Sequence, residues 1–296
     1  MAYLPKLKPA VGNQLGGMPE RRPVEVSAAV SAAFNWQIPI AYNGKNKDVS
    51  AQDGTPSRVR FRPDGLIMYV FGSLNKTIYQ YALSIAWDVS SAVYDSKSKL
   101  VTDQDASPIS MFFSIDGSKM YVSGIGNDTI YQYALSTDWD VSTATYDSKS
   151  KLVSGEDTTP LDLHLTDDGL RMFMFGDATQ FVYQYTLSTA WDVSTATYDS
   201  KSKSLTDISS DGKSMAFSPD ISKMYMMKDA DDSVYQYTLS TPGDISTASY
   251  DSGLFFHAGD EDTEPTGITF SKDGAQMYVT GQTTDSVYQY DIGSYT

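Results

Sequence analysis

The segment YQYALSTDWDVSTATYDSKS at residues 131–150 recurs almost unchanged as YQYTLSTAWDVSTATYDSKS at residues 183–202. Its opening tripeptide, Tyr-Gln-Tyr, occurs five times in the chain at intervals of 52, 52, 52 and 53 residues. The five copies begin at Tyr79, Tyr131, Tyr183, Tyr235 and Tyr288. A regular spacing near 50 residues indicates a repeat architecture in which each copy is one supersecondary unit.

Each copy is predicted to contain four short antiparallel strands, and in the second copy these cover residues 109–113, 120–122, 129–135 and 146–153. The pair Asp116-Gly117 separates the first two strands and is a hairpin signal. In the fourth copy the same turn reads Asp220-Ile221, which we interpret as drifted turn chemistry. Turns rich in Gly, Asp and Ser leave no room for a long helix. Four strands per unit at this period predict an all-β fold, a β-propeller.

The ends of the repeat array predict how the ring closes. Five copies of the first three strands are present, but only four outer strands follow them, at Tyr94, Tyr146, Tyr198 and Tyr250. Residues 42–49 match residues 94–101 at an offset of 52. We therefore predict a five-bladed β-propeller over residues 34–296, whose last blade is completed by an N-terminal outer strand. An open solenoid is the alternative, but its capping repeats are not visible.

Residues 1–33 precede the repeats and differ from them in charge. They carry a net charge of +2, which leaves −17 for residues 34–296. Several Pro and Gly residues disfavour a packed element here. We interpret the segment as an extended arm that anchors the protein by ordering on a partner, and a plain terminal tail is the alternative.

Composition excludes several classes of protein. The chain has 296 residues, a net charge of −15 and no Cys, so disulfides and thiol nucleophiles are excluded. The negative charge argues against nucleic acids and anionic membranes as partners. No apolar run approaches the roughly 20 residues that cross a bilayer. We expect no nucleic-acid partner and no membrane insertion.

The sequence carries no recognisable catalytic motif. A nucleophile elbow, a phosphate-binding loop, a dinucleotide fingerprint and a zinc-protease motif are all missing. The two histidines, His164 and His257, stand alone in the sequence, although His164 could reach a central channel. Isolated histidines on strands are more often structural than catalytic. We therefore predict a protein that is not an enzyme and has no catalytic residues.

One acidic position recurs in the links between blades, at Asp53, Asp105, Asp157 and Asp262, with Ser209 in the fourth slot. Carboxylate clusters bind hard cations, so these residues are candidate calcium ligands. Asp also suits turns because its side chain bonds the nearby backbone. We favour the turn role, in which no cofactor is required.

A second recurring feature is Trp87, Trp139 and Trp191, each followed by Asp-Val-Ser, whereas the fourth copy has Gly243. Surface Trp residues could form ligand-binding platforms for sugars. Packing is the favoured alternative, because aromatic side chains bury large areas. For the paired tyrosines we expect packing between neighbouring blades.

The repeat pattern over residues 42–292 resembles the tandem propeller repeats of structural and tail-associated proteins of marine tailed phages, and of some marine bacterial proteins. This resemblance implies a rigid structural or recognition module and transfers no catalytic residue. It implies a location in the virion and other virion proteins as partners of residues 1–33. Several copies in one assembly and a host-surface glycan or receptor as ligand are further expectations.

Three functions are therefore open. The first is a virion structural or adhesion protein, anchored by its arm and displaying the propeller. The second is a free carbohydrate-binding propeller, extracellular or at a cell surface. The third is a propeller hydrolase or lactonase with an acidic metal site. The near-equality of the blades argues against the third, because an active site usually breaks symmetry.

Overall fold

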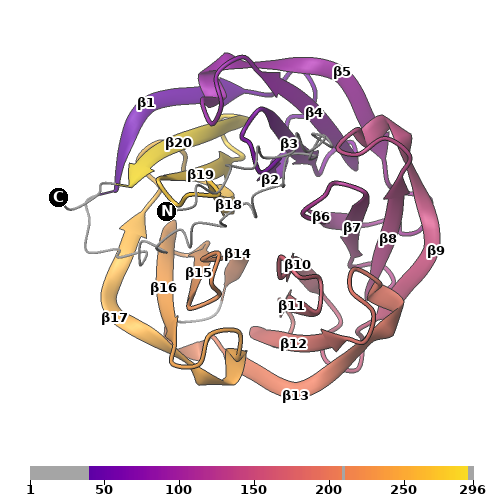
Figure 1. Cartoon of the computed structure of the whole chain (residues 1–296). Helices are drawn as coiled ribbons and strands as arrows, with labels where there is room; N and C mark the ends of the chain where they lie inside the picture. The colour runs from indigo at the N-terminus through magenta and orange to yellow at the C-terminus, as the bar shows by residue number, and fades with distance from the viewer. Residues whose placement is uncertain (1–39, 209–210, 293–296) are drawn as a thin grey trace, which may run out of the picture. The chain divides into compact units, whose positions relative to one another are not determined.

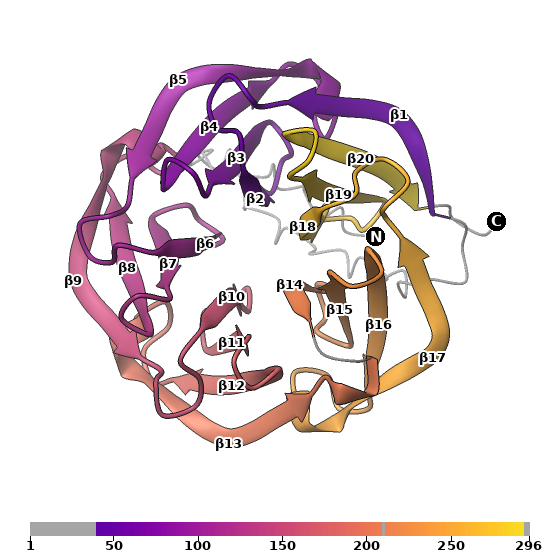
Figure 2. The same cartoon turned by 180° about the vertical axis from the view of Figure 1, so that it is seen from behind.

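The computed structural model describes residues 40–208 and 211–292, which form five four-stranded antiparallel sheets arranged around a central axis (Figures 1 and 2). The predicted five-bladed β-propeller is confirmed. The predicted arm, residues 1–33, lies outside the described residues. Within the described ranges no helix is long and apolar enough to cross a membrane.

Each blade begins with the strand beside the axis and ends with the strand at the periphery (Figure 2). Blade one contains β2 (Pro56–Phe61), β3 (Ile67–Gly72), β4 (Thr77–Leu83) and β5 (Ala92–Leu100). Blade two contains β6 (Pro108–Phe113), β7 (Lys119–Gly124), β8 (Thr129–Leu135) and β9 (Ala144–Leu152). Blade three contains β10 (Pro160–Leu165), β11 (Arg171–Gly176), β12 (Phe181–Leu187) and β13 (Ala196–Ser204). Blade four contains β14 (Gly212–Phe217), β15 (Lys223–Lys228), β16 (Ser233–Leu239) and β17 (Ala248–His257).

Blade five is built from both ends of the ring. It contains β18 (Pro265–Phe270), β19 (Gln276–Gly281), β20 (Ser286–Ile292) and, as its outer strand, β1 (Ile40–Asp48). β1 runs antiparallel to β20, with Ile40 opposite Ile292 and Asp48 opposite Ser286. The predicted closure by an N-terminal strand is therefore confirmed.

Short 3-10 helices connect the third and fourth strands. They are η1 (Val89–Ser91), η2 (Val141–Thr143), η3 (Val193–Thr195) and η5 (Ile245–Thr247), and η4 (Thr206–Ile208) follows β13. In η1 the side chain of Asp88 accepts a hydrogen bond from the backbone of Ser90, and the equivalent Asp does the same in η2, η3 and η5. Such capping explains the Asp-x-Ser spacing of the repeated motif.

The tyrosines of the repeated tripeptide pack between blades, as expected. Tyr133 of blade two is 1% exposed and lies in one apolar cluster with Tyr69 and Phe71 of blade one. Tyr81 of blade one packs in the same way with Tyr278 of blade five. Full burial of a large apolar side chain stabilises the fold by about 1.5–3 kcal/mol. The tyrosines therefore stabilise the ring one interface at a time.

In blades one, two, three and five, the glutamine of the tripeptide joins the opposite face of the blade to the next blade. Gln80 is 1% exposed, and its Oε1 accepts a hydrogen bond from the backbone N–H of Val141 in blade two (3.1 Å). Its Nε2 donates to Asp95 of its own outer strand (2.9 Å). Equivalent bonds join Gln132 to Val193, Gln184 to Ile245, and Gln289 to Val89.

Lysines of the outer strands form ion pairs with the following blade. The pairs are Lys45–Asp88, Lys97–Asp140, Lys149–Asp192 and Lys201–Asp244, at 2.6–2.9 Å between Nζ and Oδ2. These lysines therefore tie neighbouring blades together. The lysines are 37–40% exposed, so each pair contributes at most about 1 kcal/mol.

The junction between blades four and five differs from the other four. Its outer strand has Gly253 where the others have a lysine. Within the described ranges, Oε1 of the buried Gln236 has no hydrogen-bond partner, although its Nε2 donates to Asp251. This junction therefore depends on apolar packing more than the others do.

Deleting residues 1–50 should destabilise the ring, because it removes β1 and exposes the edge of β20. We expect aggregation, or a loss of at least about 3 kcal/mol, which lowers the melting temperature by roughly 6–12 °C. Deletion of residues 1–33 is the matched control, because it leaves β1 in place. Size-exclusion chromatography and thermal melting provide the readout. A monomeric 1–50 deletion with an unchanged melting temperature would show that β1 does not close the ring.

Candidate functional site

The recurring aspartates tie two loops of their own blade together. Asp105 is 2% exposed, and its carboxylate accepts hydrogen bonds from the backbone N–H groups of Ser107 (2.7 Å), Gly126 (3.1 Å) and Asn127 (2.8 Å). A Cβ added at Gly124 would come within 2.3 Å of this carboxylate, so the strand needs glycine there. We call the face that carries Asp53, Asp105, Asp157 and Asp262 the aspartate face.

The other three aspartates bind the same two loops, each in its own blade. Asp53 accepts from Thr55 and Asn75, Asp157 from Thr159 and Thr179, and Asp262 from Glu264 and Thr284. Among residues 40–208 and 211–292 no group of three or more His, Asp or Glu residues is placed to hold a metal ion. The geometry therefore accounts for these carboxylates as loop caps. Ser209 lies outside the described residues.

The recurring tryptophans lie on the opposite face, which we call the tryptophan face, defined by Trp87, Trp139 and Trp191. The indole of Trp87 covers Gly65, where an added Cβ would lie 2.4 Å from the ring. Its ring also lies 5.5 Å from that of Phe61 and 6.5 Å from that of Tyr278, between centroids. The hydroxyl of Tyr278 donates to the carbonyl oxygen of Trp87 (2.8 Å). These contacts account for the tryptophans through packing between blades.

Blade four replaces this glycine–tryptophan contact with a different pair. Ile221 occupies the glycine position at φ +53°, and Gly243 occupies the tryptophan position. The Ile221 side chain is 8% exposed and joins the apolar cluster of its blade. Left-handed backbone costs a residue with a Cβ about 1–2 kcal/mol. The turn has therefore kept its geometry despite its altered residues, with a side chain in place of the missing indole.

The blades differ most where their first strands face the axis. Five residues occupy equivalent positions in the first strands, so they share one level along the axis. They are Arg58, Ser110, Asp162, Ser214 and Gly267. The next level towards the tryptophan face has Arg60, Phe112, His164, Ala216 and Thr269. Sequence reasoning noted only His164 here. Aligning the first strands for differences between copies would have identified the rest.

Arg58 fills the axis at the first level. Its two terminal nitrogens donate to carbonyl oxygens of Ser57 (2.7 Å), Thr266 (2.9 Å), Leu161 (3.0 Å) and Lys213 (2.6 Å), which belong to four different blades. The residue is 2% exposed. Burial lowers the pKa of Arg58, and the nearby carboxylate of Asp162 opposes that shift.

Asp162 is the counter-ion of this arginine and of Arg60. Its Oδ1 lies 3.5 Å from Nε of Arg58 and 3.2 Å from Nη2 of Arg60. It also accepts hydrogen bonds from the hydroxyls of Ser110 (2.6 Å) and Ser214 (2.7 Å). Two backbone N–H groups add further bonds. Burial alone would raise the pKa of Asp162, but the two arginines and the hydrogen bonds outweigh it, so the net shift is downward.

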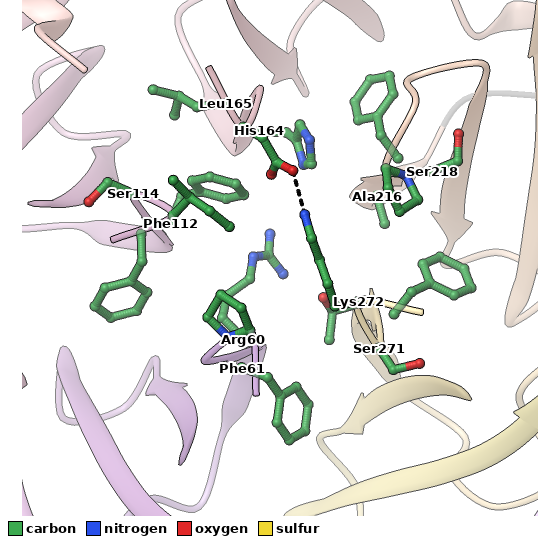
Figure 3. A pocket seen from close by; sticks show the side chains of 18 of the residues that line it. Arg60, Phe61, Phe112, Ser114, His164, Leu165, Ala216, Ser218, Ser271 and Lys272 are labelled. Carbon is green, nitrogen blue, oxygen red and sulfur yellow. Dashed lines mark hydrogen bonds and ion pairs between the residues drawn. The ribbon is translucent and has the colours of Figure 1, made fainter. Parts of the chain in front are cut away.

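Above this network, a cavity of about 160 Å³ opens at the tryptophan face (Figure 3). We call it the axial pocket. Its lining includes Arg60, Phe112, His164 and Lys272. The imidazole of His164 lies between Phe112 and Phe217, with centroids 5.0 and 4.9 Å away. Burial and the charge of Arg60 lower the pKa of His164 to about 3, so the ring is neutral at pH 7.

Comparisons with known proteins do not identify a family. The sequence matches no protein-family model and no curated protein. A functionally unknown protein from Desulfotomaculum acetoxidans is 13% identical, with a TM-score of 0.48 and coverage of 76% of this chain and 65% of that one. A provisionally assigned 6-phosphogluconolactonase from Bacteroides uniformis is 12% identical, with a TM-score of 0.49 and coverage of 80% and 66%. This chain therefore spans slightly less than two thirds of those two.

The β-propeller domain of Cps50 (Swd1) from Myceliophteria thermophila is 11% identical, with a TM-score of 0.49 and coverage of 86% of this chain and all of that domain. At such identities the resemblance concerns the fold alone.

Exchanging the blade-four pair should reveal coupling between the two positions. Ile221→Gly alone should destabilise the ring by removing a buried side chain, and Gly243→Trp alone by forcing an indole against the guanidinium of Arg171, which lies 2.2 Å from a Cβ added at Gly243, and towards Ile221. The double variant should recover at least about 1 kcal/mol relative to the sum of the two. Urea unfolding of all four proteins measures the coupling. Additive effects would show that the two positions do not share one space.

Removing a loop-capping aspartate should destabilise the protein, and the stability of the wild type should not depend on calcium. Asp105→Ala leaves three partly buried N–H groups without their acceptor, and we expect a loss of about 1–3 kcal/mol of unfolding free energy. Asp103→Ala, an exposed carboxylate in the same link, is the matched control. Thermal melting with calcium and with chelator should coincide for the wild type. A calcium-dependent rise that disappears in the Asp105→Ala, Asp157→Ala double variant would instead support a metal role.

Proposed function

We propose that this protein is a non-enzymatic structural or adhesion protein of a virion, in which residues 1–33 bind other virion proteins and the propeller is displayed. The observation that carries the proposal is how the repeated polar side chains are used. Gln80, Lys97 and Asp105, with their equivalents, all bind within the ring. These bonds make the ring rigid, which suits a structural part.

The carboxylate on the axis supports the non-enzymatic part of the proposal. Asp162 accepts five hydrogen bonds at 2.6–3.2 Å and lies against two arginines. A general base or nucleophile needs a free lone pair within reach of its substrate. The lone pairs of Asp162 accept hydrogen bonds from residues of several blades, so this residue holds the blades together.

The charge distribution and the repeats support the virion part. Residues 1–33 are cationic, whereas the rest of the chain carries −17. The arm therefore differs from the ring in the partners that it attracts. The repeats resemble those of tail-associated phage proteins, and this resemblance implies a rigid structural or recognition module. Adhesion to a host glycan or receptor belongs to the same proposal.

Deleting residues 1–33 should separate folding from assembly. The truncated ring should keep its melting temperature within about 2 °C, because β1 remains paired with β20. It should be lost from the parent particles, as measured by quantitative proteomics of purified virions. A full-length variant with Lys6, Lys8, Arg21 and Arg22 changed to Gln tests whether charge is the cause. Normal incorporation of the truncated ring, or wild-type protein found only in soluble host fractions, would refute the proposal.

A further inference from the structure

The axial pocket contains more cationic than anionic groups, on a protein whose net charge is −15. Among the residues that the structure describes, the pocket and its floor contain three cations, Arg58, Arg60 and Lys272, and two carboxylates, Asp162 and Asp167. The local formal charge is therefore +1. A buried excess charge is unfavourable unless a counter-ion or further hydrogen bonds compensate it. A bound monoanion would neutralise this excess, whereas a dianion would reverse it.

Arg60 has donors left for such an anion. The residue is 8% exposed, and its terminal nitrogens donate to Val59, Ile268 and Asp162. Among the described residues these bonds use three of the five N–H donors of a guanidinium group. The side chain lines the pocket near Lys272 (Figure 3). Arginine is well suited to carboxylates because its planar donors match their geometry.

The remaining walls of the pocket are largely apolar. Phe112, Ala216 and Phe217 line it, and Phe112 lies beneath the guanidinium of Arg60 at 5.9 Å from the ring centroid. The neutral imidazole of His164 adds one N–H donor between two phenyl rings. A ligand that fits these walls has one charged end and an uncharged ring or short chain. The volume of about 160 Å³ limits that body to the size of a benzene ring.

An ion pair lies across the mouth of the pocket. Lys272, in the turn after β18, pairs with Asp167, in the turn after β10, so the bridge joins blades five and three (Figure 3). The two side chains are 41% and 59% exposed. Exposed pairs of this kind are worth at most about 1 kcal/mol, so an incoming anion can displace Asp167 from the lysine.

We propose that the axial pocket binds a small monocarboxylate, with the carboxylate between Arg60 and Lys272 and the uncharged body against Phe112 and Phe217. The Lys272–Asp167 pair acts as a latch that opens when the ligand replaces Asp167. This proposal goes beyond the virion role and does not depend on it. The carboxylate can come from a free metabolite or from a carboxylated sugar.

Isothermal titration of the full-length protein with benzoate tests the proposal, with benzyl alcohol as the uncharged control. We expect benzoate to bind with a Kd of about 1 mM or tighter, and benzyl alcohol at least about tenfold more weakly. Lys272→Met should weaken benzoate binding about tenfold, and Asp167→Asn should strengthen it several-fold by freeing the lysine. Lys213→Met is the matched control, because Lys213 is 38% exposed and pairs with Asp229 elsewhere on the ring.

Lys272→Met and Asp167→Asn should change the affinity for benzoate in opposite directions. Because all three variants alter exposed side chains, circular dichroism and melting should confirm unchanged folding. Titration with glucuronate distinguishes the sources. Tighter binding of glucuronate than of benzoate identifies a carboxylated sugar, and the reverse order identifies a free aromatic or aliphatic carboxylate. The proposal is overturned if neither carboxylate binds, if benzyl alcohol binds as well as benzoate, or if Lys272→Met binds like Lys213→Met. Each result leaves the assembly role of residues 1–33 to be judged separately.

Discussion

Every blade of this ring buries an apolar face on each side, so no blade is stable unless both of its neighbours are in place. One side presents the paired tyrosines, such as Tyr133, and the other presents residues such as Tyr69 and Phe71. Both sides of blade five are covered as well, and β1 supplies the outer strand that completes it. Apolar packing is not directional, whereas the glutamine bonds and lysine–aspartate pairs fix how neighbouring blades are oriented. Closure is thus the condition on which the other interactions depend.

In blade four, the substitutions at the turn and at the tryptophan position form a matched pair. In blade three, the indole of Trp191 lies 2.4 Å from a Cβ added at Gly169, so only glycine fits there. In blade four, Gly243 replaces the tryptophan, Ile221 replaces the glycine, and the guanidinium of Arg171 lies 2.2 Å from a Cβ added at Gly243. A change at one position alone would leave either a cavity or a collision, and both destabilise a packed core. The fourth blade therefore keeps the positive φ of the turn with different residues.

The repeats allowed much of the fold to be predicted. The number of blades, the closing strand and the tyrosine packing follow from spacing and alternation and are confirmed, and the strands predicted for the second copy are correct to within two residues at each end. The axial network could not be found in that way, because it consists of positions that do not repeat. Arg58 and Asp162 are 104 residues apart in the sequence, and only the ring brings them into contact. The altered turn at Ile221 was interpreted as drift because the sequence does not reveal that the lost indole and the gained isoleucine occupy one space.

The position of β1 gives the ring a mechanical property. The chain enters this strand at Ile40, whose partner in β20 is Ile292, and the pairing continues to Asp48 opposite Ser286. A pull on the N-terminus along the direction of β1 would load the hydrogen bonds of that ladder in parallel. Bonds loaded in this way share the force and must break together, unlike a hairpin that unzips one bond at a time. A tether attached at this end would therefore pull on the element that keeps the ring closed, so release of the tether and opening of the ring would be a single event.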